Sequence, residues 1–148
     1  MAKITLTKTA LTKTSLNRNT LNRITLAMTA AMMLAFIAPA AQAGDPAQGE
    51  KVFKRCKACH YVDNPKNKTG PSLLNIIGRT AGSLDSYTKY SSAMVAAGEA
   101  GLVWDDDSMA AYLRKPKDFI KGTKMVFPGL KKDDQIADVI AYLHQFSE

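Results

Sequence analysis

The two cysteines of this 148-residue chain are Cys56 and Cys59, and a histidine, His60, directly follows the second. Thiols at this spacing lie about one helical turn apart and face the same side. Both can therefore add to the two vinyl groups along one edge of a porphyrin. The imidazole of the next residue then reaches the iron from the same side. The C-x-x-C-H pattern predicts covalent attachment of one haem, with His60 as an axial ligand of its iron.

Three other uses of paired cysteines fit the sequence less well. A C-x-x-C redox centre usually accompanies a βαβ pattern, and no such pattern is present. A zinc site needs four ligands, but the only other histidine, His144, lies in a helical segment near the C-terminus without a cysteine beside it. A plain disulfide, the ordinary expectation for an exported protein, would leave His60 unexplained. Haem attachment is therefore favoured.

The first 43 residues have the features of an export signal rather than of a folded domain. Five basic residues and no acidic one precede Ile24, an apolar run follows as far as Ala38, and Ala41-Gln42-Ala43 offers small residues to a signal peptidase. We expect a secretory signal peptide at residues 1–43, cleaved after Ala43, and one mature domain at residues 44–148. The expected location is the periplasm.

Two other interpretations of this N-terminal segment stay open. The uncharged run from Ile24 to Gly44 is 21 residues long, close to the roughly 20 residues that span a bilayer. Pro39 and Gln42 shorten its apolar core, so an uncut membrane anchor is the less favoured alternative. A threonine-rich start without acidic residues is also typical of organelle transit peptides. In each case the segment is excluded from the fold.

The charge of the expected mature domain differs from that of the whole chain. The formal net charge is +7, but five basic residues lie in the predicted signal, which leaves 15 basic and 13 acidic residues, or +2. The basic character of the full chain is therefore no argument for nucleic-acid binding. We expect no nucleic-acid partner.

Helix signals dominate the mature domain, and no strand alternation of any length is present. Asp45-Pro46 predicts a helix start, Gly98 a helix end, and Pro116 a stop for the preceding helix. The expected fold class is all-α. The expected helices cover residues 46–56, 91–97, 105–114 and 133–146, with a short turn or helix at 73–77 and irregular loops at 61–71 and 116–130.

Long loops are unusual in a domain of this size. A chain of 105 residues buries only about two-thirds of the surface that it exposes when unfolded, and long structureless connections within it are unexpected. A haem would supply apolar surface for the loops to cover and an iron to which they can bind. The loop content therefore supports the interpretation of the C-x-x-C-H pattern.

The second axial ligand is not decided by the residues alone. Met94 and Met109 lie in expected helices, where methionine ordinarily fills the core. His144 lies near the negative end of the last helix, which favours a solvated histidine. Met125 lies in the irregular segment 121–129, which can wrap the second haem face. Placement favours Met125 and leaves these alternatives, and the lysines, open.

Residues 44–147 resemble the class I c-type cytochromes, specifically the group of mitochondrial cytochrome c and bacterial cytochrome c2. The resemblance implies the small class I cytochrome c fold, with four to five short helices and long loops around one covalently bound haem c. The longer connection between Tyr90 and Trp104 is similar to that of bacterial cytochromes c2. The most specific pieces are Cys56–His60, Thr69-Gly70-Pro71, Gly78-Arg79, Tyr90, Trp104, Tyr112-Leu113 with Pro116, Gly122-Thr123-Lys124-Met125 and Ile140-Ala141-Tyr142-Leu143.

The same resemblance implies roles for individual residues. Met125 would be the sixth ligand of the iron, and the Pro71 carbonyl would accept a hydrogen bond from His60 and fix its tautomer. A buried propionate needs donors or a charge partner, although core packing alone would also explain the aromatic side chains. The remaining expected haem contacts are Arg79, Tyr90 and Trp104 at a propionate, and Tyr112 and Thr123 beside Met125.

Basic residues flank both segments that are expected to border the haem. Such a ring of positive charge favours fast, weak encounters with acidic docking faces of redox partners, although solvated surface lysines are also common. The expected docking residues are Lys54, Lys57, Lys117, Lys121, Lys124, Lys131 and Lys132.

Histidine and methionine together would fill both axial positions of the iron and leave no open site for a small-molecule substrate. We therefore expect an electron carrier and not an enzyme. It would be a soluble monomer that shuttles single electrons from a cytochrome bc1-type complex to an oxidase, a reductase or a photosynthetic reaction centre, contacting membrane complexes without being embedded. Two alternatives stay open: peroxidase or gas-binding activity after Met125 dissociates, and a dedicated electron-accepting subunit of one dehydrogenase.

Overall fold

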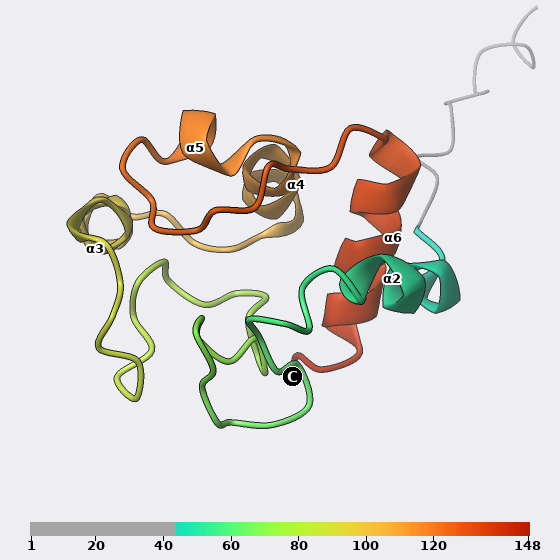
Figure 1. Cartoon of the computed structure of the whole chain (residues 1–148), viewed down its shortest axis with the longest axis horizontal. Helices are drawn as coiled ribbons and strands as arrows, with labels where there is room; N and C mark the ends of the chain where they lie inside the picture. Colours follow the sequence, from blue (N-terminus) through green and yellow to red (C-terminus); the bar gives the residue numbers. More distant parts are fainter. Residues whose placement is uncertain (1–43) are drawn as a thin grey trace, which may run out of the picture. The chain divides into compact units, whose positions relative to one another are not determined.

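The computed structural model describes residues 44–148 (Figure 1). The expected signal peptide, with its cleavage after Ala43, lies outside the described residues. Within residues 44–148 five helices alternate with loops, and one isolated antiparallel bridge pairs Thr80 with Val103. The all-α class is therefore confirmed. The helices are α2 (Pro46–Phe53), α3 (Ser92–Glu99), α4 (Asp106–Arg114), α5 (Pro116–Phe119) and α6 (Asp133–His144).

Helix α2 begins where the sequence predicts it. Asp45 is the N-cap, and its carboxylate accepts hydrogen bonds from two N–H groups of the first turn at 2.8 and 3.4 Å. The helix ends at Phe53 rather than near Cys56, and the chain continues in turns to Cys59. The N–H groups of Cys59 and His60 both donate to the Cys56 carbonyl, at 3.0 and 2.9 Å. The attachment pentapeptide is therefore one closed turn that follows the helix.

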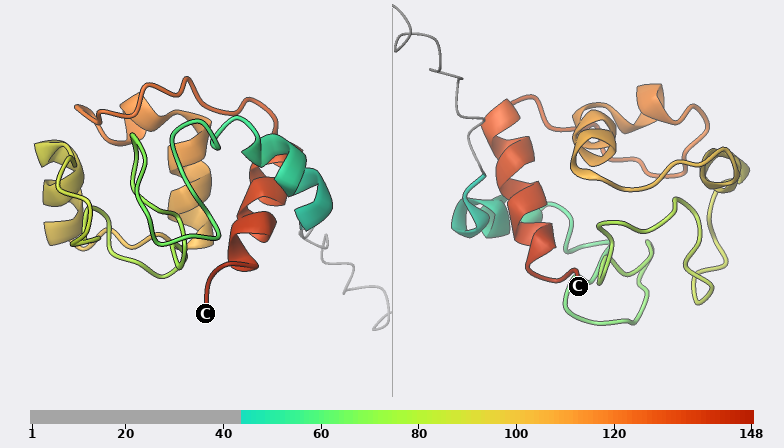
Figure 2. Two further views of the ribbon diagram at one scale, coloured as in Figure 1. Left: turned by 60° about the horizontal axis from the view of Figure 1, so that its bottom comes forward. Right: turned by 180° about the vertical axis from the view of Figure 1, so that it is seen from behind.

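The first and last helices cross at close range. Figures 1 and 2 show α2 lying across α6. Gly49 permits this approach, because a Cβ there would lie 2.0 Å from the Asp138 carbonyl oxygen. Beside it the rings of Phe53 and Tyr142 pack with their centroids 5.3 Å apart. Phe53 and Val139 are almost fully buried at 1% and 2% exposure. This contact fixes the turn that carries the cysteines against the C-terminal helix.

Helix α3 extends beyond its predicted end. Its N-cap is Ser91, whose Oγ accepts a hydrogen bond from the Met94 N–H at 3.1 Å. The prediction that Gly98 closes the helix was wrong, because Gly98 lies within it. A Cβ at Gly98 would meet the Ala81 carbonyl oxygen at 1.9 Å, so the glycine serves a close approach of two segments. The glycine with a left-handed backbone just after α3 is Gly101, with φ of +94°.

Helix α4 starts and stops as predicted, but a further helix follows. Asp105 and Ser108 form a reciprocal capping box at its start. Pro116 ends it and then opens α5, a single turn within a segment predicted to be irregular throughout. Proline is favoured at a first helical position because its missing N–H would have no helical partner there. The 73–77 segment forms turns rather than a helix.

The buried apolar side chains form one cluster drawn from helices and loops. Met94 and Met109 lie in it at 9% and 6% exposure, as expected of methionines that fill a core. Trp104 and Leu130 bring loop segments into the same cluster, at 5% and 2% exposure. Among residues 44–148, none of the helices has the length and apolar character needed to cross a bilayer.

Candidate functional site

The imidazole of His60 is held by the loop that follows the attachment turn. Its Nδ1 atom lies 2.7 Å from the Pro71 carbonyl oxygen. Because a carbonyl can only accept, Nδ1 carries the proton and Nε2 keeps its lone pair. Burial lowers the pKa of His60, and the hydrogen bond to Pro71 opposes this only in part. The ring is therefore neutral at neutral pH, with a nitrogen available to a metal.

A glycine gives the imidazole its space. A Cβ at Gly70 would lie 2.3 Å from Cε1 of His60 and 2.8 Å from both ring nitrogens. The Gly70 N–H donates to the Cys59 carbonyl at 2.9 Å, which closes the loop onto the attachment turn. The imidazole is therefore enclosed on one side by backbone, and its position is set by contacts that a larger residue would prevent.

No disulfide joins Cys56 and Cys59, of which the first is half-buried and the second exposed. Burial raises the pKa of the Cys56 thiol to about 11, with the nearby Arg55 opposing the shift. A thiol of raised pKa is a poor nucleophile and a poor thiolate ligand. Residues 44–148 contain no group of three or more His, Cys, Asp and Glu side chains that could hold a metal ion. The environment of Cys56 therefore does not resemble an activated redox or zinc thiolate.

Met125 lies in the loop between α5 and α6, next to two polar side chains. The Tyr112 hydroxyl is 3.1 Å from Oγ1 of Thr123 and donates to the Met125 sulfur at 3.7 Å. The Met125 N–H donates to the same Oγ1 at 3.3 Å. Tyr112 is 6% exposed, and burial raises its pKa. The structure thus brings Tyr112 and Thr123 to the Met125 side chain, where the resemblance expected them.

The other ligand candidates are differently placed. Met94 and Met109 are buried in the apolar cluster. His144 is exposed near the end of α6, and its Nε2 lies 2.6 Å from a carboxylate oxygen of Asp106 at the start of α4. Met125 lies partly buried in a loop, and its sulfur contacts the hydroxyl of Tyr112, a buried residue of α4.

Arg79 is a half-buried cation surrounded by backbone. Its guanidinium donates to three carbonyls of the 72–75 segment at 2.7, 3.1 and 3.2 Å. Burial lowers its pKa, and the neighbouring Tyr90 opposes that shift. Burial in turn raises the pKa of Tyr90. Arg79 forms no ion pair with another residue of 44–148. A positive charge in this setting fits the carboxylate of a bound group.

Trp104 is a core residue as well as a candidate haem contact. Its ring lies 4.9 Å from that of Tyr112 between centroids, and it is 5% exposed. Its backbone joins the same region to Arg79, because the Trp104 N–H donates to the Arg79 carbonyl at 2.9 Å. Trp104 therefore connects Tyr112, which contacts Met125, to Arg79: its ring packs against Tyr112 and its backbone is hydrogen-bonded to Arg79.

The lysines predicted to dock partners are all exposed, and six of them form no ion pair or side-chain hydrogen bond within residues 44–148. Lys124 differs from them. Its ammonium donates to the carbonyls of Lys89 and Tyr90, at 3.1 and 3.0 Å. Its charge is therefore tied to the molecule's own backbone. The six others are Lys54, Lys57, Lys117, Lys121, Lys131 and Lys132.

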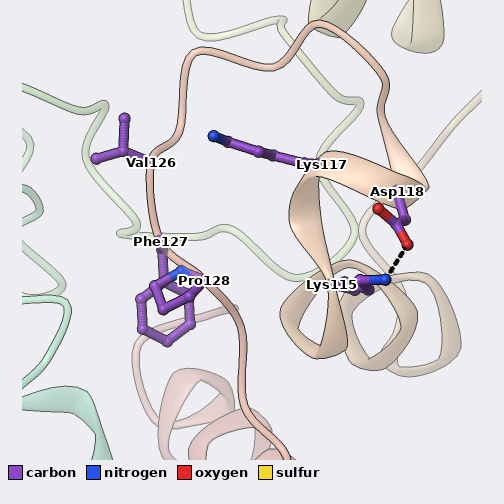
Figure 3. A pocket seen from close by; sticks show the side chains of 6 residues that line it. All are labelled: Lys115, Lys117, Asp118, Val126, Phe127 and Pro128. Carbon is purple, nitrogen blue, oxygen red and sulfur yellow. Dashed lines mark ion pairs between the residues drawn. The ribbon is translucent and has the colours of Figure 1, made fainter.

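A hollow of about 280 Å³ lies beside the Met125 loop (Figure 3). Figure 3 shows the side chain of Lys117 reaching from α5 toward Val126, while Lys115 and Asp118 form an ion pair at 2.5 Å. Val126 is 82% exposed. The surface next to Met125 therefore presents an apolar side chain among basic ones. The lining residues are Lys115, Lys117, Asp118, Val126, Phe127 and Pro128.

Sequence reasoning missed two polar residues that organise the loops around His60. The Tyr87 hydroxyl donates to the Thr69 carbonyl at 2.6 Å, and the Asn67 amide donates to the Ser86 carbonyl at 2.8 Å. No sequence pattern marks such contacts, because the acceptors are backbone carbonyls, which every residue has, in a distant part of the chain. The single available signal was their place in loops that flank predicted haem contacts.

Comparison with known proteins matches residues 46–147 to the cytochrome c family model. Cytochrome c2 of Afifella marina is 50% identical over 107 residues, which cover 71% of this chain and 86% of that protein. Cytochrome c2 of Agrobacterium tumefaciens is 48% identical over 101 residues, covering 68% and 90% of the two chains. The solved structure of cytochrome c2 from Rhodospirillum Centenum is 44% identical with a TM-score of 0.66, covering 71% of this chain and all of that one.

The family of these relatives is consistent with the residue types found in the site. The chain has two cysteines in a C-x-x-C-H arrangement, a neutral histidine with a free ring nitrogen, and a half-buried arginine without a carboxylate partner in residues 44–148. The donor set fits a haem. The chain belongs to the class I c-type cytochromes, in the cytochrome c2 group, and is a monohaem electron carrier with covalently attached haem c rather than an enzyme.

Proposed function

We propose that the haem is attached through Cys56 and Cys59 and ligated by His60 and Met125, in a diffusible periplasmic carrier. The observation that carries the proposal is the 2.7 Å contact between His60 Nδ1 and the Pro71 carbonyl, which leaves Nε2 of His60 for the iron, and the Met125 ligand is supported by the contact of its sulfur with the Tyr112 hydroxyl. The chemistry that haem c supplies when bound is one-electron transfer between ferrous and ferric iron. The residues of this chain hold and tune that chemistry.

Each axial ligand has its own support from the protein. The Pro71 carbonyl accepts the Nδ1 proton, so it fixes the tautomer of His60 and raises the basicity of the ring. Tyr112 and Thr123 hold Met125 from the other side. A thioether ligand favours the ferrous state and so raises the reduction potential. Ligands held in this way move little when the oxidation state changes, which keeps electron transfer fast.

Arg79, Tyr90 and Trp104 surround a haem propionate in this proposal. The half-buried guanidinium, with no ion-pair partner in residues 44–148, supports this role. A propionate here would be a buried charge paired with a donor-rich cation, which offsets the cost of removing both from water. Tyr90 and Trp104 would add donors and apolar walls.

The exposed lysines beside the attachment turn and the Met125 loop form the docking surface for acidic faces of redox partners. Six of them form neither an ion pair nor a side-chain hydrogen bond within residues 44–148, so their charge remains available to a partner. Such charge speeds encounter and keeps complexes short-lived and salt-sensitive. The carrier is a monomer that accepts electrons from a cytochrome bc1-type complex and delivers them to an oxidase, a reductase or a photosynthetic reaction centre.

Export follows from the N-terminal segment 1–43, with cleavage after Ala43 and a mature domain at residues 44–148. Mass spectrometry of the purified native protein tests this together with attachment. The expected result is a chain that begins at Gly44 and carries the added mass of one haem. A chain that retains residues 1–43 would point to an anchor, and a chain without the added mass would refute attachment.

The ligand assignment is tested by Met125→Ala. The ferric variant is expected to lose the near-infrared absorption band of methionine-ligated haem, whereas Met109→Leu, which changes a core methionine, should keep it. Persistence of the band in Met125→Ala would refute the assignment. Carbon monoxide distinguishes a carrier from a gas-binding enzyme, because prompt, complete binding by the reduced protein at neutral pH would contradict a six-coordinate carrier.

A further inference from the structure

The loop that encloses His60 is tied to a segment far along the chain, residues 86–90. The tie is the Tyr87 hydroxyl, which donates to the Thr69 carbonyl at 2.6 Å. Thr69 directly precedes the two residues that touch the imidazole, Gly70 by contact and Pro71 by its carbonyl. A shift of Thr69 would therefore move the groups that orient His60.

A second hydrogen bond joins the same two parts of the chain. The Asn67 amide donates to the Ser86 carbonyl at 2.8 Å, and its oxygen accepts from the Ser72 N–H at 2.8 Å. Ser72 is 2% exposed, and its hydroxyl donates to the Asn64 carbonyl at 2.6 Å. Because both ends of the Asn67 amide are engaged, its orientation is fixed by a buried part of the loop. The near end of the 86–90 segment is thus held at two points.

The other end of this segment is held from the opposite side of the site. The Lys124 ammonium donates to the carbonyls of Lys89 and Tyr90 at 3.1 and 3.0 Å. Lys124 directly precedes Met125. A large displacement of the loop that carries Met125 therefore breaks both of these hydrogen bonds or takes residues 89 and 90 with it.

The two ends of the 86–90 segment are also coupled to each other. The rings of Tyr87 and Tyr90 pack edge to face, with centroids 4.9 Å apart and planes at 78°. Ser91, which follows, is 5% exposed and caps α3. The segment is short, its aromatic side chains are packed together, and its exit is fixed by a helix cap. It is therefore suited to transmit a displacement from one end to the other.

We propose that residues 86–90 form a clamp that positions both axial ligands of the haem at once, with Tyr87 and Lys124 as its positioning residues. The inference rests on the ligand set proposed above. Neither residue touches the iron. When the hydrogen bond from Tyr87 to Thr69 is lost, residues 86–90 are held less firmly. Because the Lys124 ammonium binds these residues, the Met125 loop then opens more often. The clamp thereby couples the two faces of the site.

The test is the affinity of the ferric holoprotein for imidazole at neutral pH, because imidazole binds only where Met125 has left the iron. The apparent affinity scales with the fraction of open molecules. Loss of one hydrogen bond from Tyr87→Phe is expected to raise that affinity roughly fivefold. The matched control is Tyr142→Phe, which removes a hydroxyl without a hydrogen bond in residues 44–148 and should leave imidazole affinity at the wild-type value.

A second experiment changes Lys124, at the other end of the clamp. Lys124→Ala is expected to raise imidazole affinity by a similar factor, and Lys121→Ala, with the same loss of charge in the same loop, is the control. The reciprocal readout is hydrogen exchange of the Gly70 amide, which donates to Cys59. Lys124→Ala should speed this exchange although Lys124 lies on the Met125 side, and Lys121→Ala should not.

The double variant tests whether the two ends act through one segment. If they do, Tyr87→Phe combined with Lys124→Ala raises imidazole affinity by less than the product of the two single effects. Wild-type affinity in Tyr87→Phe, or strictly multiplicative effects, would overturn the clamp. Absence of the methionine band from the ferric wild type would instead refute the ligand set, so the two failures are distinguishable.

Discussion

The Cα of Gly70 lies against the imidazole of His60, and the space between them does not admit a methyl group. A Cβ at this position would come within 2.3 Å of Cε1. The glycine is therefore required by the neighbouring imidazole rather than by a turn, because it is absent from the residues with positive φ. The same loop supplies the Pro71 carbonyl at 2.7 Å from Nδ1. A single backbone segment thus sets both the position and the tautomer of the ring.

Gly70→Ala is expected to push the loop off the imidazole. The protein should lose about 1–3 kcal/mol of unfolding free energy, the usual range for overpacking a well-packed site. The reduction potential should also rise, because a lengthened hydrogen bond to Pro71 makes His60 a weaker donor to the iron. Denaturant unfolding and redox titration measure the two effects. Thr69→Ala, at the neighbouring position, is the control, and an unchanged potential in Gly70→Ala would contradict the role of the loop.

Gly49→Ala tests the crossing of α2 and α6. The added Cβ would lie 2.0 Å from the Asp138 carbonyl oxygen and 2.8 Å from the Tyr142 Cβ. Because the closest atom is backbone, the helices must separate, at a cost of about 2 kcal/mol or more. Guanidinium unfolding measures the loss. Glu50→Ala on the exposed side of α2 should change stability by less than about 0.5 kcal/mol, and equal effects of the two changes would refute the packing argument.

Local sequence signals were sufficient for the helices whose ends are set by their own residues. Asp45 caps α2, Pro116 stops α4, and the spacing of Ile136, Val139 and Leu143 marks the buried face of α6. The end of α3 could not be predicted in this way. Gly98 resembles a helix terminator, but its role is a contact with the Ala81 carbonyl, which lies in another segment. Tertiary contact outweighs the local preference at this position.

The candidate site also combines features that local sequence patterns predict with features that depend on tertiary contacts. The C-x-x-C-H pattern indicates its chemistry through residue types and spacing alone, so the amino-acid sequence is sufficient to predict it. The prediction of Met125 as the second ligand depended on the resemblance, because several other side chains could serve in that role, and it stays a prediction. Tyr87 and Asn67 were missed, since a hydrogen bond to a distant carbonyl leaves no mark on sequence spacing. Contacts between side chain and backbone are therefore the part of this site that no local pattern predicts.

Tyr112→Phe is expected to lower the reduction potential. The Tyr112 hydroxyl donates to the Met125 sulfur at 3.7 Å and draws electron density from it, which favours the ferrous state. Loss of this contact makes the sulfur a better donor to the ferric iron. Redox titration measures the shift, and Tyr61→Phe, a tyrosine without a hydroxyl hydrogen bond in residues 44–148, is the control. A raised potential in Tyr112→Phe would contradict this account.

The same residue gives a prediction for alkaline pH. Burial raises the pKa of Tyr112 above its ordinary value of about 10. A group whose pKa is raised in the folded state contributes its stability fully below the unfolded pKa, and that contribution is lost as pH rises through the folded pKa. The unfolding free energy should therefore fall above about pH 10. Tyr112→Phe should show a smaller fall across this range, measured by urea unfolding, and an equal fall would refute the assignment.

The hydrogen bond between His144 and Asp106 joins the end of α6 to the start of α4 but should contribute little. Nε2 lies 2.6 Å from the carboxylate, yet the side chains are 47% and 63% exposed. Water screens such a pair, and exposed pairs are typically worth less than about 1 kcal/mol. His144→Ala should therefore cost far less unfolding free energy than Gly49→Ala, which guanidinium unfolding of the two variants measures. A loss as large as that of Gly49→Ala would show that His144 does more than pair with Asp106.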